Sequence, residues 1–114
     1  MDMENMRDFG DNLGLKMWMG IVPSSETLPA IAFDHVSYKK ARTADGSVGG
    51  TMDYWRLMVV ANSYAEANAT AQTLRDADNM ISAFYRTFHV TGEQLLLPDE
   101  GDSIYRIAMD IETT

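Results

Sequence analysis

The clearest hydrophobic pattern of this chain lies near its C-terminus. From Tyr105 to Ile111, apolar residues occupy every second position and alternate with polar residues or alanine. This period of two predicts a strand over residues 104–112 that is buried on one side. Residues 90–97 are predicted as a second strand, and the intervening residues 98–102 contain a proline, a glycine and three acidic residues, which suit a turn in water. The C-terminal segment therefore predicts a β-hairpin.

A longer hairpin is predicted between residues 30 and 61. In the first strand, residues 30–40, the alternation of apolar positions changes phase between Phe33 and Val36, which predicts a bulge near Asp34. Residues 41–50 are rich in glycine and favour a turn. The second strand, residues 52–61, carries apolar residues on both faces, so we expect it to be central in its sheet.

Two helices are predicted. Ser63 and Glu66 have the spacing of a capping box, in which the serine hydroxyl accepts a hydrogen bond from the glutamate amide. Apolar residues then recur at steps of three and four as far as Phe84 and Phe88, which predicts a helix of about 22 residues and about 33 Å. Residues 4–19 show a partial helical stripe weakened by two glycines, and the proline-containing residues 20–29 are predicted to be a loop.

These elements define an α+β fold in the order α-β-β-α-β-β. We expect a four-stranded, mostly antiparallel sheet covered by one long helix. The 114 residues fit a single domain. Residues 1–28 would form the N-terminal helix and connector, and residues 29–112 the core.

Charge and composition exclude several classes of function. The 17 acidic and 9 basic residues give a net charge of −8, which disfavours general binding to nucleic acid. The absence of cysteine removes disulfides, thiolate nucleophiles and thiolate metal sites. No apolar run is long enough for a membrane span, and the first residues lack a secretion signal pattern, so we expect a protein of the cytoplasm.

Candidate catalytic and metal-binding residues are few. His35 and His89 lack the spacing of metal ligands, and we expect both to be ordinary strand residues. The acidic turn of residues 98–102 lacks the pattern of a calcium loop, and residues 46–50 resemble a phosphate-binding loop only in glycine content. We therefore predict no catalytic residue, no metal and no cofactor.

One positive patch stands out in this acidic chain. Lys39, Lys40 and Arg42 immediately precede the predicted hairpin tip. Such a run is usually only solvated, but on a protruding hairpin it could meet an acidic patch on another copy of the chain. The candidate acidic partners are Asp76, Asp78, Asp99, Glu100 and Asp102.

The second apolar face of residues 52–61 also needs a cover. Tyr54, Arg56 and Met58 share this face, and methionine and aromatic residues are favoured at protein contacts. The N-terminal helix and a neighbouring subunit are equally good candidates for that cover. In the second case these three residues belong to a subunit interface.

The order of short motifs along residues 29–112 resembles the tail terminator, or tail completion, family of long-tailed bacteriophages. The motifs are Pro29-Ala30-Ile31, Asp45-Gly46, Tyr54-Trp55-Arg56-Leu57, Ser63-Tyr64-Ala65-Glu66-Ala67 and Tyr105-Arg106. They are diffuse patterns and contain no catalytic signature. The resemblance implies a non-enzymatic virion protein with a small α+β domain. Residues 1–20 depart from the family, where a longer first helix is expected.

The resemblance also implies partners and a location. Family members assemble as a ring, typically a hexamer, that caps the tail tube, stops its polymerisation and joins it to the head–tail connector. The expected partners are further copies of the chain, the tail tube protein and the connector protein. DNA would pass through the lumen without specific binding. The protein would be assembled in the host cytoplasm and reside at the head-proximal end of the tail in the virion, away from any membrane.

Two other functions remain open at this stage. A dimeric α+β barrel could bind a small ligand or act as an enzyme, with His35 or His89 and Tyr105 as its polar groups, and its mark would be an enclosed cavity beside a histidine. A neck or head completion protein of the virion would have the same kind of sequence as a terminator. The sequence does not separate these alternatives.

Overall fold

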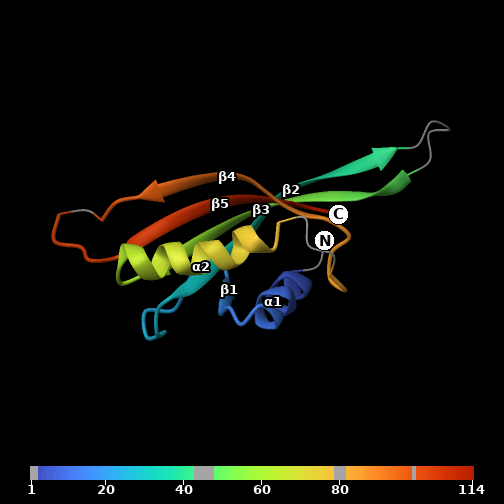
Figure 1. The fold of residues 1–114 in the computed structure, drawn as a ribbon. Coiled ribbons are helices and arrows are strands. Elements are labelled where there is room, and N and C mark those ends of the chain that lie inside the picture. The colour runs from blue at the N-terminus through green and yellow to red at the C-terminus, as the bar shows by residue number, and fades with distance from the viewer. Residues whose placement is uncertain (1–2, 43–47, 79–81, 99) are drawn as a thin grey trace.

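The computed structural model of the protein describes residues 3–42, 48–78, 82–98 and 100–114. These residues form two helices and five strands (Figure 1). Their bounds are α1 Met3–Asn12, β1 Met17–Met19, β2 Ala30–Arg42, β3 Val48–Ala61, α2 Tyr64–Asp76, β4 Phe88–Leu96 and β5 Tyr105–Thr113. The predicted α+β class is confirmed.

The five strands form one mixed sheet in the order β1-β2-β3-β5-β4. β1 runs parallel to β2, and the other three pairings are antiparallel. The predicted sheet of four strands is therefore wrong in number, because β1 adds a short parallel strand at one edge. The central place predicted for residues 52–61 is confirmed, since β3 is the third of five strands.

β1 lies inside the segment that was predicted to be one helix, residues 4–19. α1 ends at Asn12, and the chain turns at Gly14, whose φ is +76°. It then returns along α1, so that a Cβ atom built on Gly10 would lie only 2.6 Å from the side chain of Met17. Gly10 thus allows α1 and β1 to approach closely, and the glycine that weakens the helical pattern has a packing role.

The predicted start of α2 is confirmed and its predicted length is wrong. Ser63 is in an extended conformation, and its hydroxyl accepts a hydrogen bond of 3.2 Å from the Glu66 amide. The helix buries Ala67, Ala71 and Leu74 against the sheet but ends at Asp76 after 13 residues, in place of about 22. Its small residues permit the close approach to the sheet that their order predicted.

The aromatic residues that extended the helical pattern belong to other structures. The Ser82 hydroxyl accepts hydrogen bonds from the amides of Phe84 and Tyr85, which makes a local turn. Phe88 begins β4. The rings of all three residues lie within 4.8–6.1 Å of the ring of Phe9 in α1. The core therefore contains an aromatic cluster that joins α1 to the start of β4.

Both helices cover the same face of the sheet (Figure 1). Trp55, Leu57 and Val59 of β3 point to this face and are buried with residues of both helices. The opposite face of β3 has no helix over it among the described residues. The possibility that the N-terminal helix covers this second face is therefore wrong, and a neighbouring subunit is left as the candidate.

A matched pair of isoleucine substitutions tests this core. Ile111 in β5 is 1% exposed and Ile21 is 78% exposed. We expect Ile111→Ala to lower the free energy of unfolding by about 2–5 kcal/mol, because it removes buried atoms and leaves a cavity. The same change at Ile21 should stay within about 0.5 kcal/mol. Urea unfolding followed by circular dichroism measures both, and equal losses would contradict the assigned core.

Candidate functional site

The β2–β3 hairpin extends beyond the rest of the sheet. β3 pairs with β5 only as far as Asp53, which lies opposite Thr113. Beyond this point residues 39–42 and 48–52 pair only with each other, and we call residues 36–42 and 48–53 the arm. The arm projects from a molecule whose principal extents are 57, 26 and 23 Å (Figure 1). A two-stranded ribbon is at best marginally stable by itself, so a partner that covered it would add stability.

A chain of side-chain contacts fixes the root of the arm. His35 Nε2 lies 2.8 Å from Asp53 Oδ1 across the hairpin, and both side chains are largely buried. The His35 ring meets the Trp55 ring edge to face at 4.9 Å. Trp55 Nε1 donates a buried hydrogen bond of 2.9 Å to the Thr113 hydroxyl. His35 thus has a structural partner, Asp53, which the sequence pattern did not indicate because the two residues are 18 positions apart.

The arm begins at an irregularity in β2. His35 lies opposite Trp55 and Ser37 lies opposite Tyr54, which leaves Val36 as an extra residue. The predicted bulge is therefore present, two residues after its predicted position at Asp34. Bulges bend a strand and increase its twist, so this residue directs the arm away from the body of the sheet.

The arm carries the predicted positive patch. The side chains of Lys39 and Lys40 are exposed and form no ion pair with the described residues. The backbone of Arg42 ends β2, and its side chain lies outside the described part of the structure. Two cations are thus available on the arm for a contact with another molecule.

Most of the predicted acidic partners are engaged within the chain. Asp76 accepts a hydrogen bond of 2.8 Å from Gln72, and Asp78, which follows the end of α2, lies 3.2 Å from His89. The predicted helix of about 22 residues would include Asp78, and this is wrong because α2 ends at Asp76.

The acidic tip of the β4–β5 hairpin has one further carboxylate with partners in the chain. Asp102 accepts a hydrogen bond of 2.9 Å from the Ile104 amide and lies 3.6 Å from Arg106. Glu100 is exposed, and Asp99 lies outside the described residues. Among the candidate acids that the structure describes, Glu100 is therefore the one without a side-chain hydrogen bond or ion pair to another described residue.

The three predicted interface residues of β3 do share the face without helices. Tyr54, Arg56 and Met58 are successive alternate residues of this strand. Arg56 Nε lies 3.3 Å from Asp110 Oδ1, but both side chains are more than half exposed, so the pair contributes little to stability. The Tyr54 hydroxyl donates to the Met52 sulfur at 3.2 Å.

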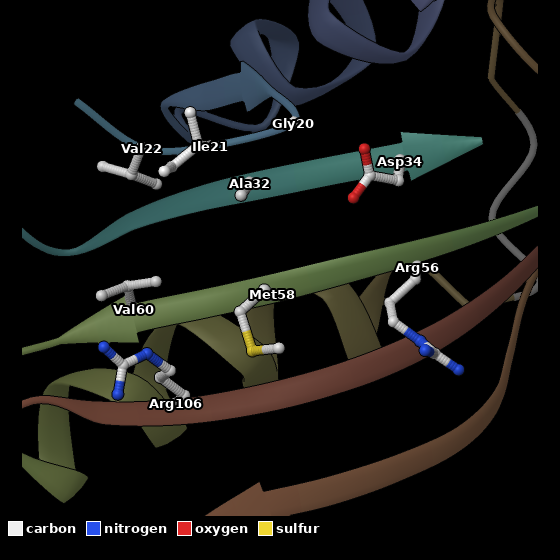
Figure 2. Close-up of a pocket in the computed structure, with 9 residues that line it drawn as sticks. All are labelled: Gly20, Ile21, Val22, Ala32, Asp34, Arg56, Met58, Val60 and Arg106. Atoms are coloured by element: carbon white, nitrogen blue, oxygen red, sulfur yellow. The ribbon is translucent and has the colours of Figure 1, made fainter. Parts of the chain in front are cut away.

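A depression of about 410 Å³ lies on this open face (Figure 2). Figure 2 shows Met58 and Arg56 along β3, with the segment from Gly20 to Val22 at one side and Arg106 at the other. The sheet positions next to Met58 are the small residues Ala32 and Ala108. The face therefore presents an apolar row beside the charged row of Arg56, and it is hollowed because its neighbours are small.

The polar groups of the alternative ligand-binding barrel are not brought together. His35 and the strand that carries His89 are separated by β3 and β5, which places them about 14 Å apart. Tyr105 lies opposite Ala61, seven residues along β5 from Glu112, the partner of His89, and thus about 24 Å away. No two of these three residues form a common site.

The space beside His35 is an open groove. Its volume is about 610 Å³, and its other lining residues, Val36, Ser37, Tyr38 and Thr51, are all exposed. A ligand pocket encloses most of the surface of its ligand, whereas this groove follows the outside of the arm. Its shape and its exposed apolar residues are more typical of a protein contact.

Arg75 connects α2 to the edge strand β4. Its guanidinium lies 2.7 Å from the Glu93 carboxylate and also donates to Asn68 and Gln72. The hydrogen bond to Glu93 raises the pKa of Arg75 above its ordinary value. Glu93 remains one-third exposed. The edge of β4 therefore presents a partly exposed carboxylate in a fixed position.

The described residues contain neither a cluster of metal ligands nor a helix suited to span a membrane. In residues 3–42, 48–78, 82–98 and 100–114, no group of three or more histidine, aspartate or glutamate side chains is placed to hold a metal ion. No helix in those ranges combines the length and apolar character that a membrane crossing needs. The notable features of the described surface are therefore the arm, the open sheet face and the strand edges.

Comparisons with known proteins add no further assignment. No family model matches the sequence, and no curated protein matches it. The resemblance to phage tail terminators thus rests on the order of motifs in the sequence.

The contact between His35 and Asp53 predicts a measurable effect on the arm. We expect His35→Ala to speed amide hydrogen exchange of residues 37–40 about tenfold, because it removes a largely buried hydrogen bond to a charged group. Asp34→Ala, a change of the adjacent exposed residue, is the control and should leave these amides unaffected. Exchange measured by mass spectrometry distinguishes the two, and equal rates would contradict a fixing role for His35.

Proposed function

We propose that this chain is a structural adaptor of a long-tailed phage, which assembles as a ring on the head-proximal end of the tail tube. In this role it stops tube polymerisation and joins the tube to the head–tail connector. The observation that carries the proposal is the arm, a two-stranded extension with exposed lysines on an otherwise acidic chain. The order of motifs along residues 29–112 supports the same class of protein.

Charge favours a role for the arm in self-association. Each copy carries a net charge of −8, so two copies repel each other at long range. Lys39 and Lys40 project on the arm, where they can meet an acidic surface of the next copy. Complementary charges at a rim raise the association rate and select the orientation of the partners.

The shape of the chain allows a ring in which the arm of each copy contacts the body of the next. The arm extends from one end of the sheet, so a contact between an arm and the body of another copy joins two different surfaces. Such heterologous contacts form closed rings when the rotation between copies closes. The six copies implied by the family resemblance are one such closure.

The acidic composition suits a ring through which DNA passes. Retention of DNA requires cations that replace the counterions of the phosphates. A lumen built from chains of charge −8 supplies few such contacts. DNA would thus pass without specific binding, while the two rims of the ring contact the tail tube protein and the connector protein.

Electron microscopy of the purified protein mixed with tail tubes tests the location. We expect density at one end of each tube and shorter tubes when the protein is present during polymerisation. Decoration of a head vertex without binding to tubes would instead indicate a neck or head completion protein. Absence of any binding to tubes or heads would contradict the proposed function.

Charge reversal on the arm tests its role in assembly. Lys39→Glu with Lys40→Glu should weaken self-association at least about tenfold and reduce its dependence on salt, because favourable charge contacts are replaced by repulsive ones. Arg7→Glu with Arg86→Glu changes the net charge equally at exposed sites outside the arm, neither of which forms an ion pair with the described residues, and serves as the control. Sedimentation over a range of concentration and salt measures both. Equal weakening in the two double variants would assign the effect to net charge and contradict the role of the arm.

A further inference from the structure

The sheet has two long edges that no described strand covers. β1 pairs with β2 only as far as Met19, which lies opposite Phe33, and the Gly20 amide donates to the Phe33 carbonyl. From Asp34 onward the outer edge of β2 has no strand partner among the described residues. β4 forms the other edge along its nine residues. Exposed edges of this kind present backbone donors and acceptors that pair readily with another strand.

The two edges run in opposite directions. The β2–β3, β3–β5 and β5–β4 pairings are all antiparallel, so β2 and β4 are antiparallel to each other. When copies are related by rotation about an axis inclined to the strands, as in a closed barrel, the β4 edge of one copy can lie antiparallel to the β2 edge of the next, with neighbouring copies staggered along the strands. The sheet would then continue from copy to copy, with neighbouring strands still antiparallel across each contact.

We infer that the arm strand of one copy pairs with β4 of the next copy, antiparallel, with Tyr38 opposite Leu95. This inference rests on the proposed ring and identifies the contact that closes it. Within one copy Tyr38 is level with Phe88, through Asp53 and Thr113, so this register staggers neighbouring copies by seven residues, about 23 Å along the strands. The backbone hydrogen bonds of such a seam supply affinity, and the side chains along it supply specificity.

Exposed apolar residues select the register of this seam. Tyr38 is 60% exposed and Leu95 is 43% exposed, so each edge strand presents a large apolar side chain that a paired strand could cover. With these two residues opposite each other, two further large and exposed apolar residues meet at the same end of the seam, Val36 at the bulge of β2 and Leu97 just after the end of β4. The seam would thus bury four exposed apolar side chains at once.

The same register pairs opposite charges. It places Lys40 opposite Glu93, the partly exposed carboxylate on the edge of β4. Glu93 already accepts hydrogen bonds from Arg75, and an ionised carboxylate has room for further donors. Lys40, which has no ion pair among the described residues, would supply one. A shift of two residues in either direction would put Tyr38 opposite Glu93 or Lys40 opposite Leu95.

The faces of the sheet agree with this register. Residues directly opposite each other in an antiparallel pair lie on the same face. Tyr38 lies opposite Asp53, which contacts His35 on the helix-covered face of the hairpin. Leu95 lies opposite the buried Ile107, so it is on the helix-covered face as well. A shift of one residue would place the two side chains on different faces.

A two-fold contact between two arms is less favourable. Antiparallel pairing of β2 with a second β2 would bring Lys39 and Lys40 of both copies into the same short seam. Like charges at facing positions are destabilising. Pairing β2 with β4 joins a cationic edge to an edge that carries Glu93. In such a ring each copy pairs its β2 edge with one neighbour and its β4 edge with the other.

Paired cysteines test the register directly, because the chain has no cysteine of its own. Opposite residues of an antiparallel pair have Cβ atoms about 4.5–5.5 Å apart, close to the range that a disulfide spans. We expect Tyr38→Cys with Leu95→Cys, mixed with tail tubes and mildly oxidised, to give a ladder of covalent multiples of 12.7 kDa on a gel without reductant. Addition of reductant should return the ladder to single chains.

Two controls accompany this variant. Tyr38→Cys with Leu96→Cys moves one thiol to the other face of the sheet and should give no ladder. Tyr38→Cys alone should remain a single chain. An equal ladder from the Leu96→Cys control would overturn the register, and efficient dimers from Tyr38→Cys alone would show pairing between two arms and overturn the seam.

Amide hydrogen exchange of the unaltered protein gives a measurement that needs no variant. On assembly we expect slower exchange at alternate residues of 36–40 and 93–96, by at least about tenfold, and no change in the already paired β5. Rings without this protection would overturn the seam and leave the proposed function intact. A chain that stays monomeric both alone and with tail tubes would overturn the proposed function and the seam together.

Discussion

The indole of Trp55 lies where the helix-covered part of the sheet ends and the arm begins, and both parts depend on its contacts. Its Nε1 atom donates to the Thr113 hydroxyl, which ties β3 to the last residue of β5. Its ring packs against Phe33 on the core side and His35 on the arm side. Because an unsatisfied buried donor costs about 1–3 kcal/mol, the pairing with Thr113 lets an indole occupy this position. The core and the arm therefore share one side chain.

The sequence predicted those elements whose signals are local. The alternation of β5 and the helix N-cap at Ser63 act within a few residues, and both are confirmed. The length of α2 could not be predicted in the same way, because the aromatic residues after Asp76 fit a helical period but pack around Phe9, a contact between distant parts of the chain. β1 was not predicted, because Gly10 in the sequence indicates only a weak helix. In the structure Gly10 has no Cβ atom and therefore leaves space for the side chain of Met17 in β1.

The candidate site divides in the same way. The cationic run at Lys39 and Lys40 is visible in the sequence, and the structure describes both side chains as exposed on the arm. The acidic surface that would contact these lysines is not visible in the sequence, because the fold decides which carboxylates already have a partner within the chain. Asp78, for example, lies beside His89, 11 positions away. No sequence pattern marked Glu93 as a candidate residue. Its place on a sheet edge follows from the insertion of β5 between β3 and β4, which no local pattern encodes.

The extra residue at Val36 separates two properties that are usually linked in a hairpin. The facing pairs from Ser37 outward are set by the register with β3, whereas the bend of the strand is set by the bulge. A chain without this residue would keep the same cross-strand pairs in the arm and point them in another direction. In an assembly built from such arms, the diameter of the circle could change by a single insertion or deletion while the chemistry of every joint stayed the same.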